Sequence, residues 1–219
     1  MPFCGHDESD GSLNKGNFKE LHAYTAERNP EVRKVVAHNA PGNNQLTSSK
    51  IQKDIVECFA KEILHSVLRE IGNDVFSLLV DESRDVAGKE QMAVVLRYAG
   101  KCGSAKESLV GLVYVKETTS KYLKSAIDDL FEKLSLSLQQ VRGQEYDGAS
   151  NMRGEFNGLQ SLIMRENNTA YYVHCFGHQL QLVVVAIVRK HKWIMIFFMI
   201  SVLLNVVYGS SKRKDLIRD

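Results

Sequence analysis

The sequence lacks an excess of charge of one sign, and its first residues lack the features of a secretory signal peptide. Its 219 residues include 28 Lys and Arg against 26 Asp and Glu, which leaves a net charge of +2 at pH 7. This balance gives no overall electrostatic footprint of a dedicated nucleic-acid-binding protein, although a local basic surface is compatible with it. The first ten residues are polar and acidic, and they have neither the basic start nor the apolar core of a signal peptide.

Paired cysteines are missing as well. The four cysteines stand far apart, form no Cys-x-x-Cys pair, and are Cys4, Cys58, Cys102 and Cys175. This spacing predicts neither a disulfide framework nor a zinc finger. Such cysteines fit a reducing compartment better than secretion, so we expect the protein in the nucleus or the cytoplasm.

Long apolar runs are absent, with one borderline case. Residues Trp193–Tyr208 are apolar except for Ser201 and Asn205. A membrane-spanning helix needs about 20 apolar residues, and basic residues on both sides of this run give no orientation signal. We therefore expect a helix whose apolar surface would pack against protein segments that are missing from this chain. Membrane association is the alternative that this run alone supports.

The sequence does contain enough apolar residues, 44%, to form a core. Residues 1–46 are predicted to be a flexible lead-in with one short helix, because their start is rich in Gly, Ser and Asp. A longer helix then begins at Ser48 or Ser49, either of which can cap it. Apolar residues recur at every fourth position as far as Ile71, and Gly72 ends the helix.

Beyond this helix the hydrophobic period changes from that of a helix to that of strands. Three apolar runs joined by short polar connectors predict consecutive antiparallel strands, at Val75–Val80, Met92–Tyr98 and Ser108–Val115. Further elements follow in the order helix, strand, helix, strand, helix, at Ser120–Leu136, Gln140–Tyr146, Gly148–Ile163, Ala170–Cys175 and His178–Lys190. The later strands each need a crossover, so they run parallel. The predicted fold is α/β, a mixed sheet with the element order of the ribonuclease-H-like fold.

Two carboxylates stand out by their position in this sheet. Asp81 is predicted at the end of the first strand and Asp147 at the end of the fourth. The two strands are neighbours in the predicted order, so the side chains would meet at one edge, where they could hold a divalent cation for phosphoryl transfer. The alternative is that each Asp ends a strand and begins a turn, which is a common use of this residue.

A second candidate cluster lies at the last strand-to-helix junction. Cys175 and His178 have a Cys-x-x-His spacing and follow His174. They could supply half of a zinc site, although no matching second pair is visible. The alternative is that they are packing and helix-capping groups.

Several stretches of the chain resemble a known family when they are taken together. They are Phe76–Ser83 with Lys89–Gln91 and Leu96–Tyr98, then Tyr146–Gly154 and His174–Leu182, and upstream Gly5–Ser9, Gly16–Phe18 and Asn39–Asn43. They resemble the conserved blocks of the hAT-type transposase-derived family, whose animal members are often labelled zinc-finger MYM-type-like proteins. The resemblance covers nearly the whole chain and is much more specific than any single block.

This resemblance implies a ribonuclease-H-like transposase domain that cuts and joins DNA with Mg²⁺ or Mn²⁺ held by two Asp and one Glu. Asp81 matches the first Asp and Asp147 the second. Cys175 and His178 match a Cys-x-x-His pair that lies near the family's active site and is associated with DNA handling. Residues 47–192 would then form a partial ribonuclease-H-like domain, and residues 193–219 the beginning of a helical insertion.

The departures from the family's pattern matter for activity. The family's Glu follows the insertion and so lies beyond the last residue of this sequence, as does the dimerisation region. Glu145 stands where the family usually has Gly, but we expect it on the opposite strand face from Asp147. We therefore expect a truncated, incomplete transposase site that is inactive alone and contacts DNA weakly. A protein-interaction module without nucleic-acid chemistry is the alternative, and no small-molecule substrate is expected.

Overall fold

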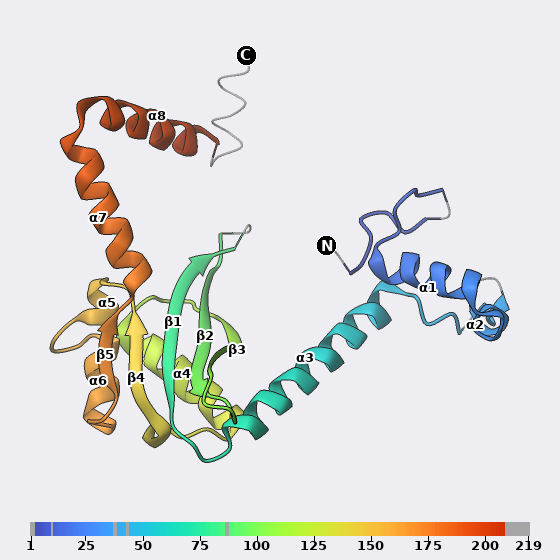
Figure 1. Cartoon of the computed structure of the whole chain (residues 1–219), viewed down its shortest axis with the longest axis horizontal. Coiled ribbons are helices and arrows are strands. Elements are labelled where there is room, and N and C mark those ends of the chain that lie inside the picture. Colours follow the sequence, from blue (N-terminus) through green and yellow to red (C-terminus); the bar gives the residue numbers. More distant parts are fainter. Residues whose placement is uncertain (1–2, 10, 37–38, 43, 86–87, 209–219) are drawn as a thin grey trace. The chain divides into compact units, whose positions relative to one another are not determined.

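The computed structural model describes residues 3–9, 11–36, 39–42, 44–85 and 88–208. The chain forms two compact units, Met1–Arg69 and Glu70–Asp219, which are drawn in Figure 1. The predicted boundaries near residues 47 and 193 fall close to the starts of α3 and α8, at Ser49 and Lys192. The domain division itself stays a prediction, and residues 209–219 of its last part lie outside the described residues.

The first unit is helical. It contains α1 (Asn17–Arg28), α2 (Pro30–Val35) and most of α3 (Ser49–Ile71). The Ser48 hydroxyl accepts the N–H of Ile51 at 3.4 Å and so caps α3. Gly72 follows the helix with a φ of +52°, a conformation that glycine adopts without steric cost. The predicted bounds of this helix are confirmed.

A buried side chain joins the start of the chain to the start of α3. Gln52 is fully buried and donates its amide N–H groups to both carboxylate oxygens of Glu8, each at 3.0 Å. Glu8 also pairs with Lys19 of α1 at 3.0 Å. Together these contacts hold residues 5–8 against α1 and α3, and the flexibility predicted for the segment stays a prediction.

The second unit is built on one five-stranded sheet. Its strands are β1 (Phe76–Arg84), β2 (Glu90–Ala99), β3 (Ala105–Tyr114), β4 (Val141–Tyr146) and β5 (Tyr171–His174). Their order in the sheet is β3-β2-β1-β4-β5, with β1, β2 and β3 antiparallel and β4 and β5 parallel to β1. The predicted mixed sheet, three antiparallel strands and then two parallel ones, is confirmed.

Two predicted element bounds are wrong. The first strand does not end at Val80, because Asp81–Arg84 continue to pair with β2 as far as Glu90. The helix predicted after Asp147 is two helices, α5 (Ser150–Arg153) and α6 (Leu159–Glu166). Between them Gly154 and Gly158 approach so closely that a Cβ on Gly158 would lie 2.2 Å from the Gly154 nitrogen.

The core lies between the sheet and two helices, α4 (Ser120–Leu134) and α6. Figure 1 shows α4 behind the sheet. The side chains of Leu123, Ile127 and Phe131 on α4 are buried, and the Phe131 ring meets Phe76 of β1 edge-on at 5.8 Å. These positions repeat every three or four residues, so they form one apolar stripe on the helix.

The opposite face of the sheet is more exposed. Leu109 and Leu112 of β3 are 61% and 62% exposed, and Val173 of β5 is 57% exposed. Residues alternate between the two faces along each strand, so the chain buries one set against α4 and α6 and leaves the other set open. We call this second surface the open face.

The last two helices carry most of the remaining apolar surface. They are α7 (Phe176–Lys190) and α8 (Lys192–Tyr208). Trp193 is 81% exposed and Phe197 73%. Of the helices within the described ranges, none is both long and apolar enough to cross a membrane.

We expect the core and the open face to respond differently to the same substitution. Leu96→Ala removes a side chain with 0% exposure and is expected to lower the free energy of unfolding by about 2–5 kcal/mol. Leu109→Ala, at an exposed position of the neighbouring strand, should change it by less than about 0.5 kcal/mol. Urea unfolding followed by circular dichroism measures both. Equal losses would contradict the assignment of the two faces.

Candidate functional site

The two predicted carboxylates lie at matching positions of neighbouring strands. The parallel pairing of β1 and β4 ends with Leu79 opposite Glu145. Asp81 and Asp147 each lie two residues further along. Because the register is shared, both side chains belong to the same end of the sheet and to the face on which Leu79 lies. Asp81 is exposed and Asp147 half-buried.

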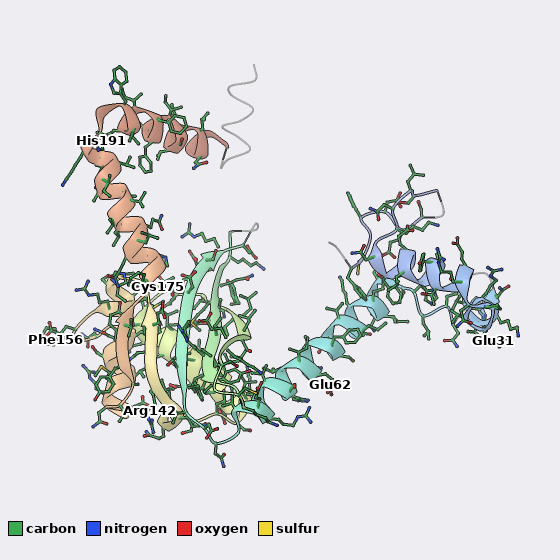
Figure 2. All side chains as sticks on the ribbon, viewed as in Figure 1. Glu31, Glu62, Arg142, Phe156, Cys175 and His191 are labelled. Atoms are coloured by element: carbon green, nitrogen blue, oxygen red, sulfur yellow. The ribbon has the colours of Figure 1, made fainter. Side chains whose placement is uncertain are left out.

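A cavity of about 220 Å³ opens at this end of the sheet. Leu79, Ala93 and Val95 of β1 and β2 contribute apolar walls. The polar and thiol side chains that line it are Asp81, Glu107, Glu145, Asp147, Cys175 and His178. All four residues singled out in the sequence therefore line one cavity. Figure 2 shows Cys175 at the base of α7, at the other end of the sheet from Arg142.

Glu145 lines the cavity together with Asp147, so its expected position on the opposite face is wrong. Residues two apart on a strand point to the same side, and Glu145 and Asp147 are two apart. Glu107 was not expected at the site at all. It comes from the edge strand β3 and pairs with Arg97 at 3.4 Å. Only the register of β2 and β3 places it there, and no local motif marks it.

Hydrogen bonds of the turn after β4 orient the Asp147 carboxylate. The backbone N–H of Ala149 donates to Asp147 Oδ1 at 3.1 Å. Asn151, in the α5 helix that follows the turn, donates to the Thr118 carbonyl at 2.9 Å and contacts Glu82 Oε2 at 3.5 Å. The start of α5 is thus tied to β1 and to the residues that precede α4.

Glu82 is a neighbouring carboxyl on the covered face of β1. Burial raises its pKa from the ordinary value, and the negative charges of Asp147, Glu90 and Asp81 act in the same direction. The hydrogen bond from Asn151 lowers the pKa and offsets part of this effect. Several negative charges therefore lie near one another around Glu82.

Three residues of the second unit have a buried polar side-chain atom without a hydrogen-bond partner. In the described part of the chain there are four such atoms, of which three are Glu82 Oε1, His174 Nε2 and His178 Nδ1. The fourth is Gln52 Oε1 of the first unit. Most buried polar groups in proteins are hydrogen-bonded, and exceptions often mark a place for water or an ion. Of these three residues only His178 lines the cavity, so its Nδ1 is the unpartnered atom that could take up water or an ion there.

Cys175 and His178 face the cavity from the junction of β5 and α7. Cys175 is a free, half-buried thiol at the N-cap of α7, where its side chain makes no capping hydrogen bond. His178 lies three residues later, on the same face of the helix. A simple capping role for Cys175 thus receives no support from its side chain.

The cavity carries two kinds of metal donor. Carboxylate oxygens such as those of Asp81 and Asp147 suit Mg²⁺ or Mn²⁺, whereas thiol and imidazole groups suit Zn²⁺. Across residues 3–208, apart from the gaps in the description, no group of three or more His, Cys, Asp or Glu side chains is placed to hold a metal ion. The fit to a divalent cation therefore rests on the two aspartates.

Comparison with known proteins extends this description. Residues 1–158 match the model of a family described as "ZMYM1/FAM200, RNase-like domain". The chain is also similar to "52 kDa repressor of the inhibitor of the protein kinase", at 22% identity to the human protein and 23% to the mouse protein over 179 residues. Each match covers 80% of this chain and 24% of the relative, so the chain spans about a quarter of the length of these relatives.

We expect removal of the Glu82 charge to stabilise the fold at neutral pH. Because the folded state raises the pKa of Glu82, ionised Glu82 lowers stability at neutral pH, and this penalty disappears as the pH falls below the ordinary value of 4.5. Glu82→Gln should therefore raise the Tm at pH 7, and the difference from wild type should close at about pH 4.

Thermal unfolding between pH 4 and pH 8 without divalent cations measures this effect. The exposed Glu132→Gln on α4 is the matched control, and it should change stability by less than about 0.5 kcal/mol. A Glu82→Gln protein whose Tm at pH 7 is equal to or lower than that of wild type would contradict the electrostatic assignment.

Proposed function

The chain belongs to the ZMYM1/FAM200 RNase-like domain family, and from this premise we propose that it is a transposase-derived domain of hAT type with a partial cation site. In this proposal Asp81 and Asp147 hold Mg²⁺ or Mn²⁺, and Cys175 and His178 border the same cavity. The single observation that supports it most is the shared register of the two aspartates at one end of the sheet.

The chemistry of the donors agrees with this role. A divalent cation bound between two carboxylates supplies charge that stabilises phosphoryl transfer and lowers the pKa of a bound water. Asp147 is oriented for such a role by the N–H of Ala149. The negative charge around Glu82 and Asp147 would be neutralised by the cation, which adds to the free energy of binding.

We propose that the site is incomplete for strand transfer by this chain alone. The hAT resemblance requires a third carboxylate, a Glu. In the described residues no third acidic side chain lies close enough to Asp81 and Asp147 to complete a three-ligand site. Two carboxylates give too little charge and too few ligands to fix two cations in one geometry.

DNA is the partner that this proposal assigns, with weak affinity. The lining of the cavity is acidic, so DNA phosphates would be repelled unless a cation is bound. We therefore expect contact with DNA to depend on divalent cations and to weaken as the salt concentration rises. The nucleus is the matching location.

A protein-interaction module is the second candidate function. It is favoured by the name of the relatives, since a repressor of an inhibitor of a protein kinase acts in regulation. The exposed apolar residues of the open face, such as Leu112, would suit protein contact. In this alternative the two aspartates are idle, and binding to DNA is absent at any salt concentration.

We expect the purified chain to bind Mn²⁺ with a Kd below about 1 mM, and Asp81→Asn with Asp147→Asn to abolish this binding. Paramagnetic resonance of free Mn²⁺ measures it. Asp129→Asn on α4 is the matched control for loss of one carboxylate and should bind as wild type does. Supercoiled plasmid incubated with wild type and Mn²⁺ should remain uncut.

The outcomes separate the two candidates. If wild type and the double variant bind Mn²⁺ alike, the cation site is refuted and the interaction module gains support. Fluorescence anisotropy with a labelled DNA duplex, with and without Mn²⁺, then completes the comparison. Binding that is independent of Mn²⁺ would contradict the proposed role of Asp81 and Asp147.

A further inference from the structure

We propose that Tyr172 and His174 of β5 are positioning residues that hold Asp147 in its cation-binding orientation. This inference rests on the proposed role of Asp147 as a ligand. The Tyr172 hydroxyl donates to the backbone carbonyl of Asp147 at 2.9 Å. The His174 ring lies against Gly148, the next residue in the chain.

Tyr172 is itself held in place. Its ring packs on Tyr146 of β4, with 5.9 Å between the ring centroids, and the buried Tyr146 hydroxyl donates to Gln144 Oε1 at 2.8 Å. The donor that fixes the Asp147 carbonyl therefore has a defined position.

His174 also limits the turn, through its contact with Gly148. A Cβ on Gly148 would lie 3.0 Å from His174 Cε1 and 3.1 Å from Nε2, so glycine lets the backbone pack directly on the ring. The side-chain amide of Gln179 donates to the His174 carbonyl at 2.8 Å, and the Cys175 N–H donates to the Tyr146 carbonyl at 2.8 Å.

These contacts act on the main chain of the turn and leave the Asp147 carboxylate free to face the cavity. Its Oδ1 accepts the Ala149 N–H, whose position depends on the same turn. Groups that orient a ligand are part of a metal site because they reduce the entropy lost on binding. Removing the Tyr172 hydroxyl should therefore weaken cation binding without removing any ligand.

The neighbouring Tyr171 is a natural control. It lies on the same strand, pairs with Gly143 and is 67% exposed. Its side chain points to the opposite face from Tyr172, because the faces alternate along a strand. Tyr171→Phe removes the same hydroxyl from the same element without touching Asp147.

The experiment is Mn²⁺ titration of the full chain as wild type, Tyr172→Phe and Tyr171→Phe, together with the Tm of each. We expect Tyr172→Phe to raise the Kd about three- to tenfold, the effect of one net hydrogen bond. Tyr171→Phe should stay within about twofold of wild type. If wild type binds Mn²⁺ and Tyr172→Phe binds it equally well, the inference is refuted, whatever the Tm values are.

A second measurement tests the positioning of Asp147 separately from the proposed cation site. Hydrogen exchange of the Ala149 amide, in protein free of divalent cations, reports the turn directly. It should be faster in Tyr172→Phe than in Tyr171→Phe. The same exchange measurement tests the role of the His174 ring. Gly148→Ala should speed exchange of the Ala149 amide, because its Cβ would meet the ring. Adding His174→Ala should reverse part of that effect.

Each of the two proposals has an outcome of its own that refutes it. Absence of Mn²⁺ binding in wild type refutes the proposed function and leaves the exchange result as the test of positioning. Ala149 exchange that is the same in all variants refutes the positioning of Asp147 by Tyr172 and His174, even if wild type binds Mn²⁺.

Discussion

The parallel pairing of β1 with β4 is the contact on which the rest of the second unit depends. It joins the antiparallel hairpins of the first three strands to the later strands, and β4 in turn pairs with β5. The register set at Leu79 and Glu145 places Asp81 and Asp147 at the same end of the sheet. A shift of one residue would turn one of the aspartates to the covered face. The sheet and the candidate site therefore share one structural determinant.

One face of the sheet forms the core, and the other carries the candidate site. Helices α4 and α6 bury one face, where Leu78 and Leu96 have 0% exposure. The open face carries the acidic cavity, whose carboxylates would be costly to bury in a closed core. Asp147 takes part in both faces. Its backbone is held by the partly buried Tyr172, whereas its carboxylate faces the cavity.

Membership of an RNase-like domain family gives this arrangement a context. The family match ends at residue 158, before β5 and α7 contribute Cys175 and His178. The chain spans about a quarter of its human and mouse relatives, so the regulatory role in their name belongs to proteins with much additional sequence. The aspartate pair and its β5 supports are, in contrast, contained within this chain.

The sequence by itself determined the element types, the strand directions and four residues that line the candidate cavity, Asp81, Asp147, Cys175 and His178. Hydrophobic period and capping are local, so α3 and the five strands could be predicted from Ser48, Gly72 and the apolar runs. Tertiary structure alone decided the length of β1, the break between α5 and α6, and the presence of Glu107 and Tyr172 at the site. These features depend on strand register and on contacts between distant segments, which no local pattern encodes. The position of Glu145 differs from these features, because alternation along β4 is local and already places it on the same face as Asp147.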